Sequence, residues 1–129
     1  ERTLLGFCVL GGIFSEGIDL KRDRLIGVII VGTGIPMVCT EREILKDYFQ
    51  AQGDDGFDFA YRYPGMNKVL QAAGRVIRTV EDVGIVVLLD ERFFTAPYLR
   101  LFPREWADYE RVSLSRIERR VERFWDEWL

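Results

Sequence analysis

Short apolar runs alternate with amphipathic segments along the 129 residues of this chain. Three of these runs, residues 4–10, 25–32 and 84–90, have the length and composition of β-strands. Because each run is continuously apolar rather than alternating, we expect its strand to be covered on both faces, as in a parallel sheet between helices. The last two runs reach Gly32 and Asp90 at their carboxyl ends, where α/β proteins place ligand-binding loops.

Helical periodicity predicts a first helix over residues 41–52. Thr40 and Glu43 have the spacing of a capping box, in which two side chains satisfy free backbone N–H groups at a helix start. The segment is amphipathic, so its apolar side chains are expected to form an inner face. These side chains are Ile44, Leu45, Tyr48 and Phe49.

Two more helices are expected farther along the chain. The first covers residues 66–78, or begins earlier with a kink at Pro64. Residues 92–106 contain two prolines and several aromatic side chains, which predicts short surface turns held by aromatic anchors. Residues 113–129 form the last helix. Its apolar positions recur at helical spacing: Ile117, Val121, Phe124 and Trp128.

This alternation of strands and helices predicts an α/β sandwich with a mostly parallel sheet, in a single domain. Three strands are few for such a fold. The chain also starts at Glu1 rather than at a methionine, and it enters a strand-like run almost at once. We therefore expect a sandwich that is incomplete at its amino-terminal side.

Composition narrows the classes of function. The formal charge of −3 leaves no global positive charge, so any nucleic-acid contact must come from a local patch. The chain has no histidine and two isolated cysteines, Cys8 and Cys39, which argues against a zinc site or a histidine-based triad. The thiols are expected to be free and buried, in a reducing intracellular compartment. The longest apolar run is far below the roughly 20 residues that span a bilayer, so no membrane partner is expected.

Three polar side chains of the second predicted helix form one stripe. Gln71, Arg75 and Arg78 follow i, i+4, i+7 spacing, opposite the apolar face of that helix. A charged stripe usually only faces water, and this interpretation stays open. Gly74 points to a ligand, because glycine inside a helix costs about 1 kcal/mol relative to alanine and allows a close approach beside Arg75. Guanidinium groups also suit phosphate oxygens.

Residues 11–25 are rich in glycine and follow the first predicted strand. Ser15, Glu16 and Asp19 suit an ordinary surface turn, or a ligand loop for sugar hydroxyls, a hydrated cation or an arginine partner. Residues 32–36 contain a lone Gly-x-Gly, which does not complete the dinucleotide fingerprint.

The two polar segments together resemble motifs V and VI of superfamily 2 helicases, in the Rad3/XPD and DinG branch. Residues 15–19 read Ser-Glu-Gly-Ile-Asp, close to motif V of that branch, although Arg22 replaces a frequent glycine. Residues 101–106 are similar to the segment that follows motif VI in DinG-like proteins. Motif VI has the pattern Gln-x-x-Gly-Arg-x-x-Arg, matched here by Gln71, Gly74, Arg75 and Arg78.

This resemblance implies that residues 1–129 are the second RecA-like domain of an ATP-dependent 5′–3′ DNA helicase, a sandwich of the P-loop NTPase type, truncated at its amino-terminal side. ATP and Mg²⁺ would be bound mainly by a first RecA-like domain of the same protein, and single-stranded DNA would contact both domains. An iron–sulfur cluster, which many relatives hold, would lie elsewhere in the full-length protein. The enzyme would work in the cytoplasm at the nucleoid, or in the nucleus. The chain has no phosphate loop, so we expect it to be inactive alone.

The resemblance also implies roles for individual residues. Arg75 and Arg78 would be arginine fingers at the γ-phosphate, with Gln71 close to the hydrolytic site. Gly74 would belong to the same ATP-binding set, and Asp19 would approach the ribose. Three motif V residues would couple the nucleotide site to DNA: Ser15, Glu16 and Gly17.

Two other functions stay open. A RecA-like domain without catalytic activity would serve as a protein-interaction platform, although such a platform need not keep the motif VI arginines. A phosphate loop encoded upstream of this segment would favour the helicase over the platform. A nucleotide-binding domain of a metabolic enzyme is less favoured, because the glycine fingerprint is incomplete.

Candidate DNA contacts are the loop after the first predicted strand and a turn at residues 61–65. Its aromatic side chains, Tyr61 and Tyr63, are expected to pack in the protein rather than stack on bases, because aromatic residues are most often buried. Arginines of the last predicted helix alternate with carboxylates, so an ion-paired face is favoured over a DNA-binding one. These arginines are Arg116, Arg119, Arg120 and Arg123.

Overall fold

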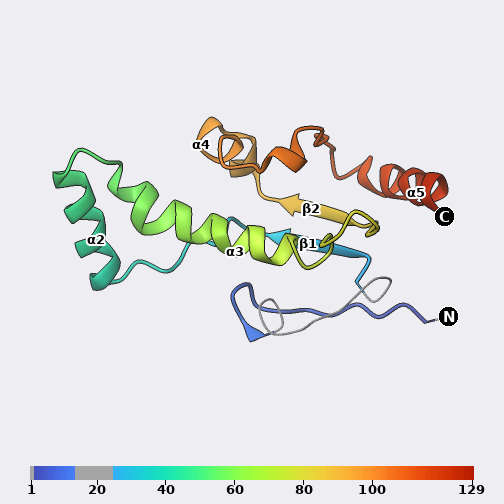
Figure 1. Ribbon diagram of the computed structural model, residues 1–129, viewed down its shortest axis with the longest axis horizontal. Coiled ribbons are helices and arrows are strands. Elements are labelled where there is room, and N and C mark those ends of the chain that lie inside the picture. Colours follow the sequence, from blue (N-terminus) through green and yellow to red (C-terminus); the bar gives the residue numbers. More distant parts are fainter. Residues whose placement is uncertain (1, 14–24) are drawn as a thin grey trace. The chain divides into compact units, whose positions relative to one another are not determined.

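The computed structural model describes residues 2–13 and 25–129 of the chain (Figure 1). Within this part, strands β1 (Gly27–Val31) and β2 (Ile85–Leu89) form a two-stranded parallel sheet. The register places Gly27 opposite Ile85 and Val31 opposite Leu89. Two of the three predicted strands are therefore confirmed, and so is their parallel pairing.

The strand predicted at residues 4–10 is wrong. These residues have no regular secondary structure, and all except Leu10 are exposed: Leu4 is 93% and Phe7 is 92% exposed. An apolar run gives the propensity for a strand, but only a neighbouring strand with free backbone groups makes one. The sequence pattern does not reveal whether such a neighbour is present.

Helices provide most of the remaining regular structure in the described residues. The chain forms two units, Glu1–Phe93 and Phe94–Leu129, which are described separately. The α-helices are α2 (Thr40–Ala51), α3 (Tyr63–Ala73), α4 (Ala96–Leu99) and α5 (Ile117–Trp128). A π-helical segment spans Asp58–Arg62, and 3₁₀ turns span Glu91–Phe94 and Arg104–Trp106. The described chain is thus a small α/β structure.

The core of the first unit lies where α3 packs on β1. Helix α3 begins earlier than residue 66, and the helical backbone continues through Pro64, which lies in the first turn where proline is tolerated. The apolar stripe of α3 then faces the sheet. The buried side chains of this core include Ile30, Tyr61, Met66, Val69 and Val76.

Glycines set the contact between the loop after β1 and the first turn of α3. A Cβ atom on Gly34 would lie 2.6 Å from the carbonyl oxygen of Gly65, and one on Gly65 would lie 2.8 Å from that of Thr33. Gly34 also has a φ of +68°, which side chains with a Cβ atom rarely adopt. Packing of two backbones therefore explains Gly34, whereas Gly32 has a φ of +90° and no atom within 4 Å of an added Cβ.

A second glycine contact lies at the opposite end of α3. A Cβ atom on Gly84, directly before β2, would lie 2.3 Å from Cγ1 of Val76, so this valine packs on bare backbone. The start of α3 therefore lies near the carboxyl end of β1, and the segment after α3 lies near the amino end of β2. Helix α3 runs opposite to the strands, as Figure 1 shows.

Burial differs from the prediction in two elements of the first unit. Strand β1 is covered on one face only, because Ile30 is 4% exposed while Ile29 and Val31 are 60% and 76% exposed. Helix α2 has no buried residue, and its expected inner face is largely open, with Ile44 63% exposed. Periodicity identified these apolar faces but not whether the described chain covers them.

The predicted capping box is also absent. Helix α2 begins at Thr40, Cys39 is its N-cap residue, and no side chain caps it. The Glu43 carboxylate instead accepts a hydrogen bond from the Tyr61 hydroxyl at 2.6 Å and pairs with Lys46 at 2.7 Å. The Glu43 carboxylate, which the spacing in sequence assigns to the helix cap, is therefore bound by Tyr61 and Lys46 instead.

The second unit is held by aromatic contacts, as expected for residues 92–106. Tyr98 is 3% exposed, and the Phe102 ring meets Trp106 and Tyr109 edge-on with centroids 5.2 and 5.3 Å away. Helix α5 begins at Ile117 rather than at residue 113 and has no buried residue. Both cysteines are free, as predicted, but they are exposed rather than buried.

Candidate functional site

Helix α3 ends before the two arginines that are predicted to be arginine fingers, Arg75 and Arg78. Helix α3 ends at Ala73, five residues short of the prediction. The N–H of Gly74 donates to Leu70 at 2.9 Å, and the N–H of Arg75 donates to Ala72 at 3.3 Å, so the last turn tightens from i+4 to i+3 bonding. Residues 76–80 are mostly β-branched, which disfavours helix continuation.

The prediction that Gln71, Arg75 and Arg78 form one stripe on a helix is therefore wrong. Gln71 lies in the last turn of α3 and is exposed, Arg75 lies in the following turn and is half-buried, and Arg78 lies beyond it and is exposed. Gly74 is the C-cap residue rather than a helix-interior one, so the helix-interior cost inferred for it does not apply.

Val76 anchors this segment between the two arginines. Its side chain is 4% exposed and packs against Gly84 at the start of β2. Because Val76 is buried, its neighbour Arg75 is held at a fixed point at the edge of the core. The segment therefore has a defined position beside the amino end of β2.

Asp82 fixes the backbone at the second arginine. Its Oδ2 atom accepts hydrogen bonds from the N–H groups of Arg78 at 2.9 Å and Thr79 at 2.8 Å. The N–H of Asp82 donates back to the carbonyl of Thr79 at 3.2 Å, which closes a tight turn. The N–H groups of Arg78 and Thr79 hold the pKa of the Asp82 carboxyl below its ordinary value, with a smaller contribution from the charge of Arg78.

The arrangement supplies hydrogen-bond donors and positive charge. Two guanidinium groups and one amide are carried within eight residues, at and after the end of one helix. Guanidinium groups bind phosphate oxygens through paired, charge-assisted hydrogen bonds. Within residues 2–13 and 25–129 there is no cluster of three or more cysteine, aspartate or glutamate side chains that would hold a metal ion.

The other predicted site residues belong to motif V. They are Ser15, Glu16, Gly17 and Asp19, and they lie outside the described residues, as does Arg22. Sequence analysis did not single out Val76, Asp82 or Gly84. Asp82 follows Thr79 at a spacing typical of side-chain capped turns, and this was the available signal for it.

Ligand loops were expected at the carboxyl ends of the two strands. In the structure, the residues that follow each strand contact other residues of this chain. The loop after β1 packs on Gly65 of α3. After β2, Asp90 Oδ1 accepts from the backbone N and from Nε of Arg92, each at 2.9 Å, and Oδ2 accepts from Nη2 at 2.8 Å. These hydrogen bonds lower the pKa of the Asp90 carboxyl.

Residues 61–65 are helical rather than a turn. Tyr61 is 2% exposed, and its hydrogen bond to Glu43 raises the pKa of its hydroxyl to about 12. Tyr63 is half-buried and meets the Phe59 ring edge-on at 5.2 Å. The expectation that these tyrosines pack within the protein is confirmed.

Comparison with known proteins identifies the family of the chain. Residues 1–109 match the family described as "Helicase C-terminal domain". The chain belongs to this family. The match confirms the resemblance to DinG and Rad3/XPD-type helicases, since DinG-type and telomere-elongation helicases are among the relatives.

Three relatives illustrate the similarity. The chain is 30% identical to a probable ATP-dependent helicase of Methanocaldococcus jannaschii over 92% of its length, and 34% identical to the ATP-dependent DNA helicase DinG of Photobacterium profundum over 78%. It is 38% identical to the human regulator of telomere elongation helicase 1 over 70%. The chain spans 20%, 15% and 8% of the lengths of these relatives. In the described part, no helix has the length and hydropathy of a membrane span.

Proposed function

We propose that this chain is the second RecA-like domain of an ATP-dependent 5′–3′ DNA helicase and supplies motif VI to an ATP site shared with a first RecA-like domain. The observation that carries the proposal is the placement of Gln71, Arg75 and Arg78 on one short, tertiary-anchored surface segment of a helicase C-terminal domain. Motif VI of the resembling helicases has these residue types at this spacing.

The chemistry assigned to the arginines is charge stabilisation. In phosphoryl transfer, negative charge spreads over the oxygens of the transferred group, and an arginine finger is worth about 10³–10⁵ in rate. Arg75 and Arg78 donate hydrogen bonds to the γ-phosphate, and Gln71 lies near the attacking water. Gly74, directly before Arg75, belongs to the same proposed ATP-binding set. ATP and Mg²⁺ are bound mainly by the first domain.

Motif V takes the second set of roles in this proposal. Asp19 approaches the ribose, and Ser15, Glu16 and Gly17 couple the nucleotide site to single-stranded DNA. These assignments are carried by the sequence match at residues 15–19. Such an enzyme acts where DNA is, in the cytoplasm at the nucleoid or in the nucleus.

A RecA-like sandwich has helices on both faces of a larger parallel sheet. The open face of β1, with Ile29 and Val31 exposed, supports the proposal that further strands and helices of the full-length protein complete the fold there. Apolar side chains on a central parallel sheet are normally covered. We propose that residues 1–129 form one part of that domain.

Steady-state ATP hydrolysis by the full-length protein tests the function. Arg75→Ala and Arg78→Ala are each expected to remove single-stranded-DNA-stimulated turnover while leaving the fold intact, as checked by circular dichroism. Arg100→Ala, at another exposed arginine, is the matched control and is expected to retain turnover. Normal turnover in both motif VI variants would contradict the proposal and favour an interaction platform without catalytic activity.

A further inference from the structure

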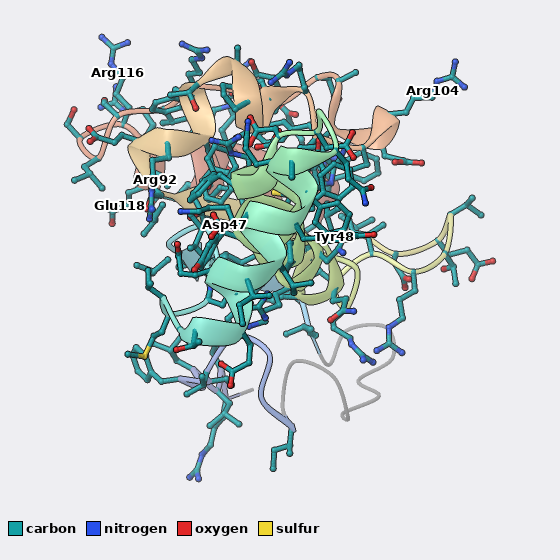
Figure 2. All side chains as sticks on the ribbon, turned by 90° about the vertical axis from the view of Figure 1, so that its left-hand side faces the viewer. Asp47, Tyr48, Arg92, Arg104, Arg116 and Glu118 are labelled. Atoms are coloured by element: carbon teal, nitrogen blue, oxygen red, sulfur yellow. The ribbon has the colours of Figure 1, made fainter. Side chains whose placement is uncertain are left out.

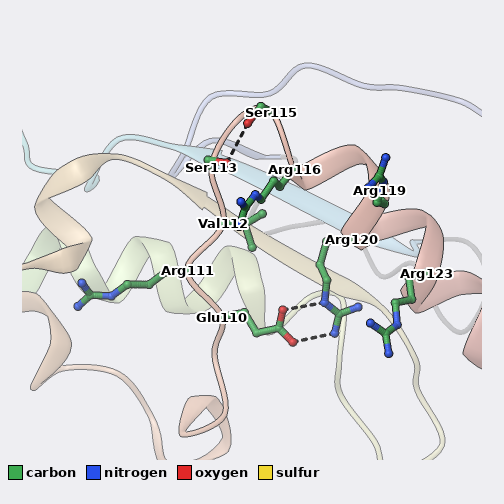
Figure 3. Close-up of a pocket in the computed structure, with 9 residues that line it drawn as sticks. All are labelled: Glu110, Arg111, Val112, Ser113, Ser115, Arg116, Arg119, Arg120 and Arg123. Atoms are coloured by element: carbon green, nitrogen blue, oxygen red, sulfur yellow. Dashed lines mark hydrogen bonds and ion pairs between the residues drawn. The ribbon is translucent and has the colours of Figure 1, made fainter.

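The second unit contains an open pocket lined largely by arginines (Figure 3). The lining residues include five arginines and one carboxylate, although the chain as a whole carries a net charge of −3. Ser113 and Ser115 add two hydroxyl groups at the same pocket. The charged residues are Glu110, Arg111, Arg116, Arg119, Arg120 and Arg123.

The arginines of α5 and of its N-cap residue lie close enough for their positive charges to repel one another. Residues 116, 119, 120 and 123 follow i, i+3, i+4, i+7 spacing, which places them on one face of the helix. Like charges at these spacings are destabilising. Glu122 is three residues from Arg119, a spacing at which opposite charges attract and offset part of this repulsion, whereas Glu118 lies on another side of the helix.

Among the residues that the structure describes, ion pairs compensate Arg120 and Arg123. Glu110 accepts from Nε and Nη2 of Arg120, each at 2.7 Å, and Arg123 pairs with Glu127 at 3.2 Å. No carboxylate partner for Arg116 or Arg119 is found in the part of the chain that the structure describes. The predicted ion-paired face therefore holds for Arg120 and Arg123 and fails for the other two.

Arg120 has donor capacity that Glu110 does not use. Its Nη1 atom is buried and has no hydrogen-bond partner among the described residues. Arg116 extends from the ribbon into solvent, as does Arg104, which is not among the residues lining the pocket (Figure 2). The pocket thus combines excess positive charge, an unsatisfied guanidinium nitrogen and two serine hydroxyls that hydrogen-bond to each other at 3.1 Å.

We propose that this pocket binds phosphate groups of a single-stranded nucleic-acid backbone. Arginine clusters supply the charge and the paired donors that phosphates require, and neutral hydroxyls commonly add further phosphate contacts. Nucleic acid is favoured over an anionic lipid surface because residues 1–109, directly before the pocket in the chain, match a helicase C-terminal domain. The contact lies in a different unit from Arg75 and Arg78 and does not depend on their role in hydrolysis.

Equilibrium binding of a fluorescent oligothymidylate to the full-length protein, measured over a range of salt concentrations without nucleotide, tests this inference. Arg116→Gln/Arg119→Gln removes two charges with little change in helix propensity. Each lost phosphate contact lowers the salt slope by about 0.7 for single strands, so the double variant is expected to lose about 1.4. Arg100→Gln/Arg104→Gln removes the same charge from exposed positions outside the pocket and is expected to bind nearly normally.

A variant that gains affinity distinguishes the inference from misfolding, because a misfolded protein would lose binding. Glu110→Gln removes the single carboxylate of the pocket and releases Arg120, so it is expected to bind the oligonucleotide more tightly and with a steeper salt slope. Equal losses in the two double variants, or no loss in either, would overturn the inference. Binding of phosphatidylserine vesicles through Arg116 and Arg119, with oligonucleotide binding unchanged, would overturn it in favour of a lipid surface.

Discussion

The Asp82 carboxylate holds the backbone of Arg78, accepting its N–H at 2.9 Å and that of Thr79 at 2.8 Å through one oxygen. The two residues are four apart in sequence and lie in a segment without regular secondary structure. Since no helix or strand orients Arg78, the backbone position of this arginine is fixed by the Asp82 side chain and by the burial of Val76. Under the proposed function, Asp82 is a positioning residue for Arg78.

Replacing Asp82 should therefore slow hydrolysis without removing any group that touches ATP. A misplacement of about 1 Å at a reacting centre costs on the order of 10²-fold in rate, and we expect Asp82→Ala in the full-length protein to lose 10- to 100-fold in kcat. The KM for ATP should change little. Asp82→Asn keeps one accepting oxygen and should recover part of the loss. Wild-type kcat in Asp82→Ala would show that the cap is not needed.

The same contact predicts a pH dependence of the turn. The pKa of Asp82 is lowered from 3.8 because its charged form accepts the N–H groups of Arg78 and Thr79. A lowered folded-state pKa means that the stabilisation is present above pH 3.8 and is lost as pH falls through the lower value. Amide proton shifts of Arg78 and Thr79, followed by NMR, should titrate with a midpoint below 3.8. A midpoint at or above that value would contradict the cap.

Close packing of the loop after β1 on α3 predicts a large effect of one methyl group. Gly65→Ala would place a Cβ atom 2.8 Å from the Thr33 carbonyl oxygen. Overpacking against backbone costs about 1–3 kcal/mol, so we expect a loss of that size in the free energy of unfolding. Gly6→Ala is the control, because no atom lies within 4 Å of its added Cβ. Equal stability of the two variants in urea titrations would contradict this packing.

Alkaline titration should report the contact between Tyr61 and Glu43. The hydrogen bond to Glu43 raises the pKa of Tyr61 from 10.0 to about 12. A raised folded-state pKa means that the stabilisation is complete below pH 10 and is lost as pH rises toward about 12. The free energy of unfolding should fall over this range more steeply in the wild type than in Tyr61→Phe. Tyr48→Phe, at an exposed residue, should follow the wild type.

Sequence analysis predicted the elements whose signals are local. The apolar, β-branched runs at residues 25–32 and 84–90 contain β1 and β2, and the order of motif residues identified the family. The end of α3 was missed although the mostly β-branched residues 76–80 were a local signal for it, whereas the packing of Val76 on Gly84 is visible only in three dimensions. The Glu43 carboxylate was assigned to a cap because its stronger partner, Tyr61, is visible only in three dimensions.

Predicted burial failed where a partner surface decides it. The apolar positions of α2 and one face of β1 were identified by periodicity, yet the described chain leaves both exposed. Periodicity shows that a face is apolar, whereas coverage depends on which other elements pack there. The motif VI arginines were found as residue types and spacing, and their placement after the helix required the structure.

The central claim concerns Arg75 and is tested most directly by separating ATP binding from ATP hydrolysis in one sample. Full-length Arg75→Ala should bind ATP with nearly normal affinity, while its single-turnover hydrolysis rate on single-stranded DNA falls by about 10³-fold or more. Hydrolysis at the wild-type rate with ATP bound would contradict the assignment of Arg75 as an arginine finger.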